Sequence, residues 1–286
     1  VLSRAGADIV LLETGGDQAY LTVDPQSALS RLYQAPGLGP FPAGFGVKRL
    51  QEDLQREVER QRLYGTLPSL SPCTNAWVQR PELNAVQTAV QARGSDARFF
   101  YNLFLCQYGV EDSLTYTNDL FALYQALKGG GRRICVVNGD PPPPTPEEIA
   151  AVKRGNYTSA EQLAAGLSAN IRYPANIELQ RLMTKAFIDL VLEEETSCGG
   201  SVAKLTSRAV SLICWLSRYQ KELFPDWKAP EVAVFLQFGR CASDIGALFL
   251  RLLARLPVDV LVLLPNLNEG SVLRAPDLLE HCAFAS

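Results

Sequence analysis

The sequence contains a single histidine, His281, which lies among its last residues. A Ser-His-Asp triad needs a histidine beside its nucleophile, and a metal site built from histidines needs more than one. The chain therefore gives no support for either kind of site. Its residues identify no catalytic group and imply no particular cofactor.

Close cysteine pairs are also missing. The chain has seven cysteines, and no two of them show the C-x-x-C spacing that zinc sites and redox motifs use. Most lie in apolar runs, where a free thiol behaves as a small hydrophobic group. An odd number of cysteines without a disulfide framework favours a reducing compartment. We therefore expect a cytoplasmic protein without a metal site.

Long hydrophobic runs and clustered basic residues are absent as well. No apolar run reaches the roughly 18 residues that a membrane-spanning helix requires. The net charge is −3, and the lysines and arginines are scattered along the chain. Nucleic-acid binding depends on a surplus of positive charge against the phosphate backbone. We therefore expect neither a membrane span nor a nucleic-acid partner.

The remaining composition is typical of a globular protein. Of the 286 residues, 47% are hydrophobic and 20% are charged, which are ordinary proportions for a folded domain. This length is long for one domain and allows two.

Two pairs of stretches have matching patterns. The opening residues VLSRAGADIVLL (1–12) align without a gap with LLARLPVDVLVL (252–263). In the second pair, FLCQYG (104–109) and FLQFGR (235–240) each precede an amphipathic helical pattern and a further apolar run. Repetition of this kind indicates internal duplication. We therefore expect residues 1–12 to form a helix end and a strand like residues 252–263, and the chain to be a fragment of a longer protein.

Helical and strand patterns alternate through the first half of the chain. PELNAVQTAVQARG (81–94) predicts a helix, and the aromatic run RFFYNLFLCQYG (98–109) predicts a buried strand. TNDLFALYQALKGGG (117–131) predicts a helix ended by glycines, and RRICVVNGD (132–140) predicts the next strand. The caps that we predict for the second helix are Thr117, Asn118 or Asp119.

Residues 146–223 are predicted to form a helical insertion. A proline run leads to Thr145, which can cap a helix that has Pro146 at its first position and Glu148 three residues on. Between residues 174 and 223 the apolar side chains recur every three or four positions, which predicts two helices with one buried face each. The residues expected on that buried face are Leu182, Phe187, Val191, Leu212 and Trp215.

The order of these elements predicts the fold class. Strands that alternate with helices of ten or more residues favour parallel pairing through right-handed crossovers. The continuous apolar runs VAVFLQF and DVLVLL suit strands covered on both faces. We therefore predict a three-layer α/β protein with Rossmann-like parallel sheet units. An N-terminally truncated unit spans 1–145, the helical insertion spans 146–223, and a second unit begins in 224–286.

The loop GRCASDIG, after one predicted strand, is the candidate ligand site. Ligands of open parallel sheets bind beyond the carboxyl ends of the strands. Gly239 permits a sharp turn, Arg240 supplies a cation, and Ser243 or Asp244 caps a helix whose first amides can bind an anion. The alternative is an ordinary capped turn, since a capping carboxylate repels anions and no dinucleotide or Walker fingerprint is present.

Two further residues follow predicted strands and join the candidate set. Asp140 is a carboxylate at a strand end, where it can bind a hydroxyl group or a magnesium ion. Asn118 lies near the loop that follows the first buried strand. Nothing in the spacing places a second carboxylate opposite Asp140.

Two stretches carry a resemblance to a known family. Residues 98–149, which contain FLCQYG and the proline run, and residues 235–273, which contain FLQFGRCASDIG, resemble the YceG-like bacterial family. That family is found beside tellurium-resistance stress genes and is described as a component of a biosynthetic module. The resemblance covers most of the chain, but its motifs are not catalytic signatures and it assigns no site residues. It implies a phosphorylated or nucleotide-like metabolite as the ligand.

Two classes of function stay open at this point. The first is a metabolite-binding enzyme, with transferase as the reaction class, that works in a cleft between duplicated α/β halves. The second is a noncatalytic scaffold that uses its helical insertion to hold other proteins of the same stress operon.

Overall fold

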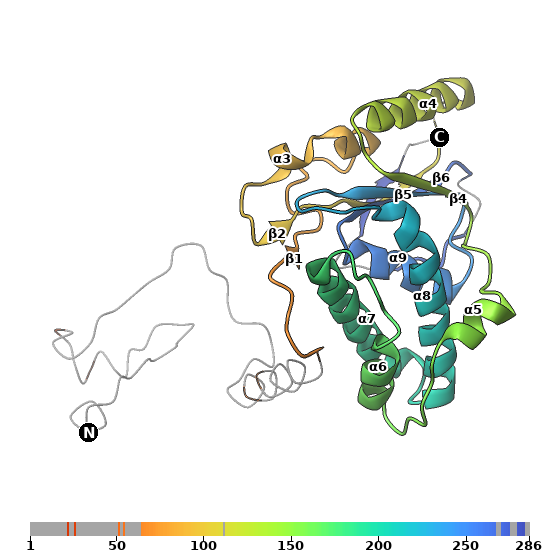
Figure 1. Ribbon diagram of the computed structural model, residues 1–286. Helices are drawn as coiled ribbons and strands as arrows, with labels where there is room; N and C mark the ends of the chain where they lie inside the picture. Colours follow the sequence, from red (N-terminus) through yellow and green to blue (C-terminus); the bar gives the residue numbers. More distant parts are fainter. Residues whose placement is uncertain are drawn as a thin grey trace. The chain divides into compact units, whose positions relative to one another are not determined.

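The computed structural model describes residues 22, 26, 51, 54, 64–110, 112–266, 270–274 and 279–283. The chain divides into two compact units, Val1–Glu59 and Arg60–Ser286. Every helix and strand named below belongs to the second unit (Figure 1). The helix end and strand predicted over residues 1–12 lie outside the described residues.

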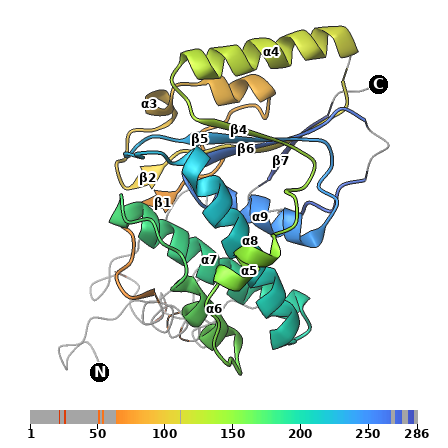
Figure 2. The same ribbon diagram turned by 45° about the vertical axis from the view of Figure 1, so that its right-hand side comes forward.

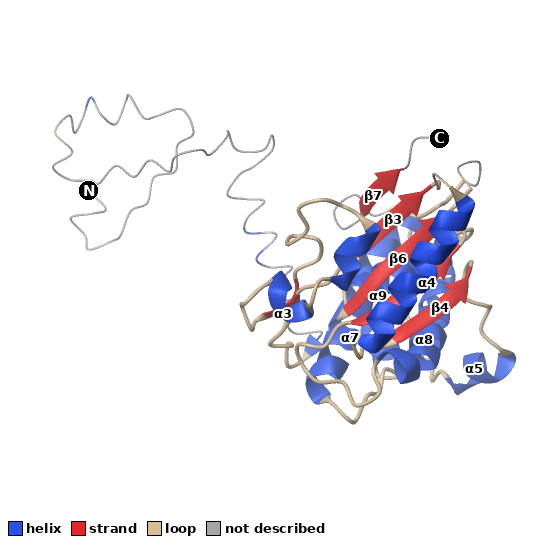
Figure 3. Ribbon diagram, turned by 90° about the horizontal axis from the view of Figure 1, so that it is seen from above, coloured by secondary structure: helices blue, strands red, loops and turns tan. Residues whose placement is uncertain are grey.

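A five-stranded parallel sheet forms the centre of this unit. Its spatial order is β4-β5-β6-β3-β7, and each neighbouring pair is parallel (Figure 3). The bounds of its strands are β3 Phe104–Tyr108, β4 Ile134–Asn138, β5 Ala233–Phe238, β6 Val258–Leu264 and β7 Glu280–Ala283. A separate pair of short parallel strands joins β1 (Ser71–Pro72) to β2 (Phe99–Phe100).

Apolar sequence accounts for the central strands. Every residue of β6 is buried, as expected for a parallel strand with helices on both faces. Phe104 and Phe235 both pair in register with Val260, so their three side chains lie on one face of the sheet. The adjacent residues Leu105 and Leu261 belong to a second apolar cluster on the opposite face.

Helices cover both faces of the sheet unequally (Figures 1 and 2). Helix α4 (Ser113–Gly129) and the 3-10 helix η2 (Leu83–Gln87) lie on one face. The helices on the other face are α6 Ala160–Ser168, α7 Ile177–Ser197, α8 Val202–Leu223 and α9 Asp244–Ala254. The parallel α/β architecture is therefore confirmed.

The predicted helical pair is also confirmed. Helices α7 and α8 span most of residues 174–223, and they form part of the layer beneath the sheet. The residues predicted for the buried face are all buried: Leu182, Phe187, Val191, Leu212 and Trp215. Ahead of them, the capping box of Thr145 and Glu148 starts α5 (Pro146–Ala151), as its sequence predicts.

Two predictions about local structure were wrong. Residues 81–94 form η2 and the short helix α3 (Val90–Arg93) rather than one helix. The buried Arg93 explains the break, because its guanidinium donates to the carbonyls of Val86 and Thr88, which a continuous helix would use itself. Helix α4 begins earlier than predicted, since Asp112 caps it by accepting from the amide of Thr115 at 2.7 Å.

Strands from both predicted α/β units lie side by side in the one sheet. The two strand-helix-strand segments nevertheless differ in their connections. The segment β5-α9-β6 joins neighbouring strands, whereas β3-α4-β4 passes across β6 and β5 to reach the edge of the sheet. Their helices lie on opposite faces.

Candidate functional site

The carboxyl edge of the sheet, where the sequence predicts a ligand, is built on tight glycine turns. Gly139 follows β4 with φ of 67°, and Gly239 follows β5 with φ of 95°, a backbone conformation that favours glycine. The amide of Gly139 donates to the carbonyl of Phe238 at 2.7 Å, and that of Gly239 donates to Leu263 at 2.8 Å. These bonds bring the loops after β4 and β5 together.

Asp140 occupies the amino terminus of helix α9. Its carboxylate accepts from the amides of Ala242 at 3.0 Å and Ser243 at 2.8 Å, and from the Ser243 hydroxyl at 2.5 Å. The Ser243 hydroxyl in turn caps the helix by accepting from the amide of Gly246 at 3.1 Å. Two amides just before the helix therefore already bind the carboxylate of Asp140, which places a negative charge where an external anion would approach.

The other predicted residues lie around this cluster with fewer contacts. Asp244 is an exposed partner of Arg208 at 3.4 Å. Arg240 is exposed, and its guanidinium makes no ion pair or hydrogen bond within the described residues. Asn118 is exposed on α4, across the sheet from α9, so it does not join the cluster. The structure thus brings Gly239, Arg240, Ser243, Asp244 and Asp140 together and leaves Asn118 apart.

Buried polar atoms near the same edge are incompletely satisfied. Gln107 and Gln237 each stand one residue before the end of their strands, and both side chains are buried. The Gln237 amide donates to the carbonyl of Arg240 at 3.2 Å. The side-chain oxygens of both glutamines have no hydrogen-bond partner in the described part of the chain.

Two buried thiols at this edge stay protonated at neutral pH. Burial raises the pKa of Cys106 to about 11. Burial, with a smaller contribution from the charge of Asp140, raises the pKa of Cys241 to about 12. Because the thiolate is the nucleophilic form of cysteine, this burial lowers the nucleophilicity of both side chains.

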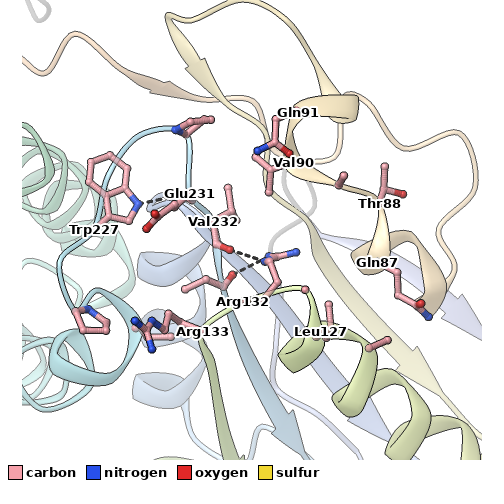
Figure 4. A pocket seen from close by; sticks show the side chains of 18 of the residues that line it. Gln87, Thr88, Val90, Gln91, Leu127, Arg132, Arg133, Trp227, Glu231 and Val232 are labelled. Carbon is pink, nitrogen blue, oxygen red and sulfur yellow. Dashed lines mark hydrogen bonds between the residues drawn. The ribbon is translucent and has the colours of Figure 1, made fainter.

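A cavity of about 510 Å³ lies at the opposite, amino-terminal edge of the sheet. It is formed mainly by residues 87–91, by residues 130–133 before β4, and by residues 225–227 and 230–233, which lead into β5. Figure 4 shows Trp227 and Arg133 on one side of this cavity, which we call the polar cavity, and Gln87, Thr88 and Gln91 on the other.

The two arginines of the polar cavity differ in their bonding. Arg132 donates to the carbonyls of Val232 at 2.7 Å and Val86 at 3.2 Å, and its remaining donors bind Ala233 and Asp259. Arg133 is exposed, and its guanidinium has no bonding partner among the residues that the structure places. Arg133 is thus available to an anionic ligand.

A buried ionic cluster lies next to the polar cavity. The carboxylate of Asp259 binds Arg93 through two hydrogen bonds of 2.8 Å and binds Arg132 at 2.7 Å. The same carboxylate accepts from the amide of Leu103 at 2.7 Å. Two arginines share one buried carboxylate, so the cluster has a surplus of one positive charge that solvent screens poorly.

Sequence reasoning missed the polar cavity for a physical reason. The rule for parallel sheets directs attention to the carboxyl edge, and this cavity lies at the other edge. The arginine pair in GGGRRICVV was the available signal, because two adjacent cations at a strand start need partners. Trp227 lies in FPDWKAP. The prolines of this stretch predict a break between a helix and a strand, but they do not predict a cavity.

Within the described ranges, no three or more His, Cys, Asp and Glu side chains gather in a way that could hold a metal ion. None of the helices in those ranges is both long enough and apolar enough to cross a bilayer.

Comparison with known proteins identifies the family of the chain. The sequence model described as the YceG domain matches residues 82–276, well over half of the 286 residues. This match includes the loop after β5 and almost all of the polar cavity. No curated protein and no solved structure matches the chain. The chain therefore belongs to the YceG domain family.

Proposed function

We propose that this chain is a cytoplasmic metabolite-binding protein of the bacterial stress response, associated with tellurium resistance. In this proposal it is a component of a biosynthetic module, its ligand is phosphorylated and nucleotide-like, and group transfer to or from that ligand is its reaction class. The module and the tellurium association rest on the family resemblance of the sequence, and the family match itself names only the YceG domain. The observation that supports the ligand class is the polar cavity with the guanidinium of Arg133, which has no bonding partner among the described residues.

The polar cavity has the size of a small-molecule site, and its lining includes Arg133, a cation with no bonded acid in the described part of the chain, beside the acids Asp226 and Glu231. Its volume of about 510 Å³ lies within the range of small-molecule sites, roughly 300–1,000 Å³. The Arg133 guanidinium can bind a phosphate through two parallel hydrogen bonds. The neighbouring Arg93–Asp259–Arg132 cluster adds positive potential. Gln87 and Gln91 offer amide groups to the polar remainder of a ligand.

The predicted loop after β5 is the rival site. The amides of Ala242 and Ser243 in this loop bind Asp140, and Arg240 supplies it with an exposed cation for an anion. A phosphate at that loop would meet the carboxylate of Asp140 at close range, which opposes binding.

The two arginines provide a matched test. Ribose 5-phosphate is titrated into the parent protein, Arg133→Ala and Arg240→Ala by isothermal calorimetry. We expect Arg133→Ala to weaken binding by about 1.5–3 kcal/mol, the scale of a hydrogen bond to a charged group. Arg240→Ala, an equally exposed arginine at the other edge, should bind like the parent. The opposite result would place the phosphate at the loop after β5, and no effect of either change would reject a phosphate-binding role for both arginines.

Internal duplication into Rossmann-like units stays part of the proposal. Its support is the shared ending of β3 and β5, where Gln107 and Gln237 each precede an aromatic residue and then a glycine of positive φ. The different crossovers of the two segments oppose a simple duplication. A structure that places residues 1–12 on the pattern of residues 252–263 would support it.

A noncatalytic scaffold that binds other stress-operon proteins is the second candidate. One surface favours it: Leu114 is 71% exposed and Phe121, two turns on along α4, is 64% exposed. Val136 and Phe238 are also exposed, on the same side of the sheet as α4. Exposed apolar groups that gather on one side suit a protein partner.

The scaffold is tested with a Leu114→Ser, Phe121→Ser double variant. Each purified protein encoded beside this one is mixed with the parent or the variant, and complex formation is followed by sedimentation velocity. A scaffold predicts a complex with the parent that the variant loses. A metabolite-binding protein predicts no complex, and unchanged ribose 5-phosphate binding in the variant.

A further inference from the structure

A second cavity adjoins the polar cavity. Its volume is about 300 Å³, and we call it the aromatic cavity. Four residues line both cavities, so the two share a boundary: Val90, Gln91, Trp227 and Pro230. Beyond that boundary the wall of the aromatic cavity is formed mainly by Leu70, Phe99, Phe100 and Tyr101.

Three polar side chains around the aromatic cavity are already engaged in hydrogen bonds or an ion pair. The Trp227 indole N–H donates to the carbonyl of Glu231 at 2.8 Å, and the Tyr101 hydroxyl accepts from the amide of Asp96 at 3.3 Å. The Asp96 carboxylate is paired with Arg98 at 2.6 Å. The cavity therefore presents aromatic surface and no unpaired cation, so a flat apolar ring fits it better than a charged group does.

The packing of its wall shows that the aromatic cavity is preformed. A Cβ added to Gly94 would lie 2.1 Å from Cζ of Tyr101, so the absence of a side chain at Gly94 gives the tyrosine ring its place. Trp227 is only 4% exposed, and its indole is held by its hydrogen bond. Fixed walls lower the ordering cost of binding.

We propose that the ligand of this protein is a phosphate ester that carries an aromatic ring, with its phosphate on Arg133 in the polar cavity and its ring in the aromatic cavity. This inference rests on the function proposed above and specifies its ligand class. The boundary shared at Gln91 and Trp227 lets one molecule enter both cavities. Two sources supply this chemistry, a nucleotide and an aryl phosphate.

Three probes separate the ring from the phosphate. They are ribose 5-phosphate, which has no aromatic ring, adenosine 5′-monophosphate and phenyl phosphate. Calorimetric titration of the parent should show at least one ring-bearing probe binding roughly tenfold or more tightly than ribose 5-phosphate, since stacking of a base on an aromatic side chain contributes on the order of 1–3 kcal/mol. Tighter adenosine 5′-monophosphate identifies a nucleotide, and tighter phenyl phosphate identifies an aryl phosphate.

A filled cavity then tests the position of the ring. Ala97 lines the aromatic cavity and is exposed, so Ala97→Phe occupies the cavity without disturbing the core. Ala97→Phe should lower the affinity of the ring-bearing probe to that of ribose 5-phosphate and leave ribose 5-phosphate unchanged. The matched control is Ala150→Phe, an exposed alanine on α5 that lines neither cavity, which should bind all three probes like the parent.

The outcomes distinguish this inference from the proposed function. Equal affinity for ring-bearing and ring-free probes, or no effect of Ala97→Phe, overturns the ring site while the phosphate site stands. Unchanged binding of all three probes in Arg133→Ala overturns the phosphate site instead. In that case adenosine, which lacks phosphate, tests the ring alone: its loss on Ala97→Phe supports the aromatic cavity, and no binding to the parent overturns it.

Discussion

The two edges of the central sheet differ in the charged groups that they contain and in the partners of those groups. At the carboxyl edge, the carboxylate of Asp140 accepts from the amides of Ala242 and Ser243, just before α9. At the amino-terminal edge, two arginines share the single carboxylate of Asp259, and nearby Arg133 forms no ion pair with a residue that the structure describes. The carboxylate of Asp140 is thus satisfied by nearby amides, whereas the Arg93–Asp259–Arg132 cluster keeps a surplus of one positive charge next to the polar cavity.

This difference shows that a helix start is an anion site only if its donors are free. The motif GRCASDIG contains the glycine, cation and hydroxyl of an anion-binding turn. Its anion comes from Asp140, about a hundred positions earlier in the chain. Whether a loop that the sequence favours can bind an anion therefore depends on which of its hydrogen-bond donors are already bonded within the protein.

The largest effect that we expect comes from Asp259→Ala at the amino-terminal edge. This change leaves the buried guanidinium of Arg93 without its acid, and loss of one partner of a buried ion pair costs about 3–5 kcal/mol. Urea unfolding of the variant should show a loss of that size in the free energy of unfolding. Asp96→Ala, which removes a surface partner of Arg98, is the matched control and should lower the free energy of unfolding far less, because solvent screens an exposed ion pair. Similar losses in the two variants would mean that the buried cluster does not stabilise this edge.

Much of the fold follows from local patterns. Continuous apolar runs predict β5 and β6, and the three- and four-residue spacing predicts α7 and α8 with their buried faces. These elements are predictable because their own residues determine them. The break of residues 81–94 into η2 and α3 is different, since it depends on Arg93 bonding to Asp259, far away in the sequence.

The same distinction applies to the sites. The turn after β5 is predictable, because glycine and serine have local preferences there. The bonds from the amides of Ala242 and Ser243 to Asp140 are not predictable, since they require β4 and β5 to be neighbours in the sheet. The polar cavity combines segments separated by more than a hundred residues, 87–91 and 225–233, and no local pattern brings them together.

An intermediate effect is expected from Gly246→Ala at the carboxyl edge. A Cβ at this position would lie 2.7 Å from the carboxyl carbon of Asp140, so the substitution should push the carboxylate off the helix start. Overpacking of this kind costs about 1–3 kcal/mol. The free energy of unfolding, measured with urea, should fall by that amount.

The control for this prediction is the same change in an Asp140→Ala background. Without the carboxylate the clash disappears, and alanine should then stabilise the helix by up to about 1 kcal/mol, because glycine is a poor helix former. A cost that stays the same in both backgrounds would show that Gly246 is constrained by something other than Asp140. The Asp140→Ala protein should also gain stability with added sulfate, since the amides of Ala242 and Ser243 no longer bind a carboxylate.

The smallest effect concerns pH and the ion pair that anchors the chain after β4. Arg218 donates to Glu148 at 2.6 Å and to the carbonyl of Pro142 at 2.9 Å. The hydrogen bond from Arg218, helped by the amide of Thr145, holds the pKa of Glu148 below its usual range. A carboxylate whose pKa is lowered on folding stabilises the fold at pH values above its unfolded pKa of about 4.3.

This stabilisation is lost as the pH falls through the lowered pKa of the folded state. Glu148→Gln keeps the capping geometry and removes the charge, so it should cost about 0.2–1 kcal/mol at pH 7. The difference from the parent in free energy of unfolding, followed by urea titrations from pH 7 to pH 3, should shrink as the acid is protonated. Glu161→Gln, at the exposed first turn of α6 and without an arginine partner in the described structure, is the control. A pH-independent difference, or an equal one in the control, would show that Arg218 orders this edge without stabilising it through charge.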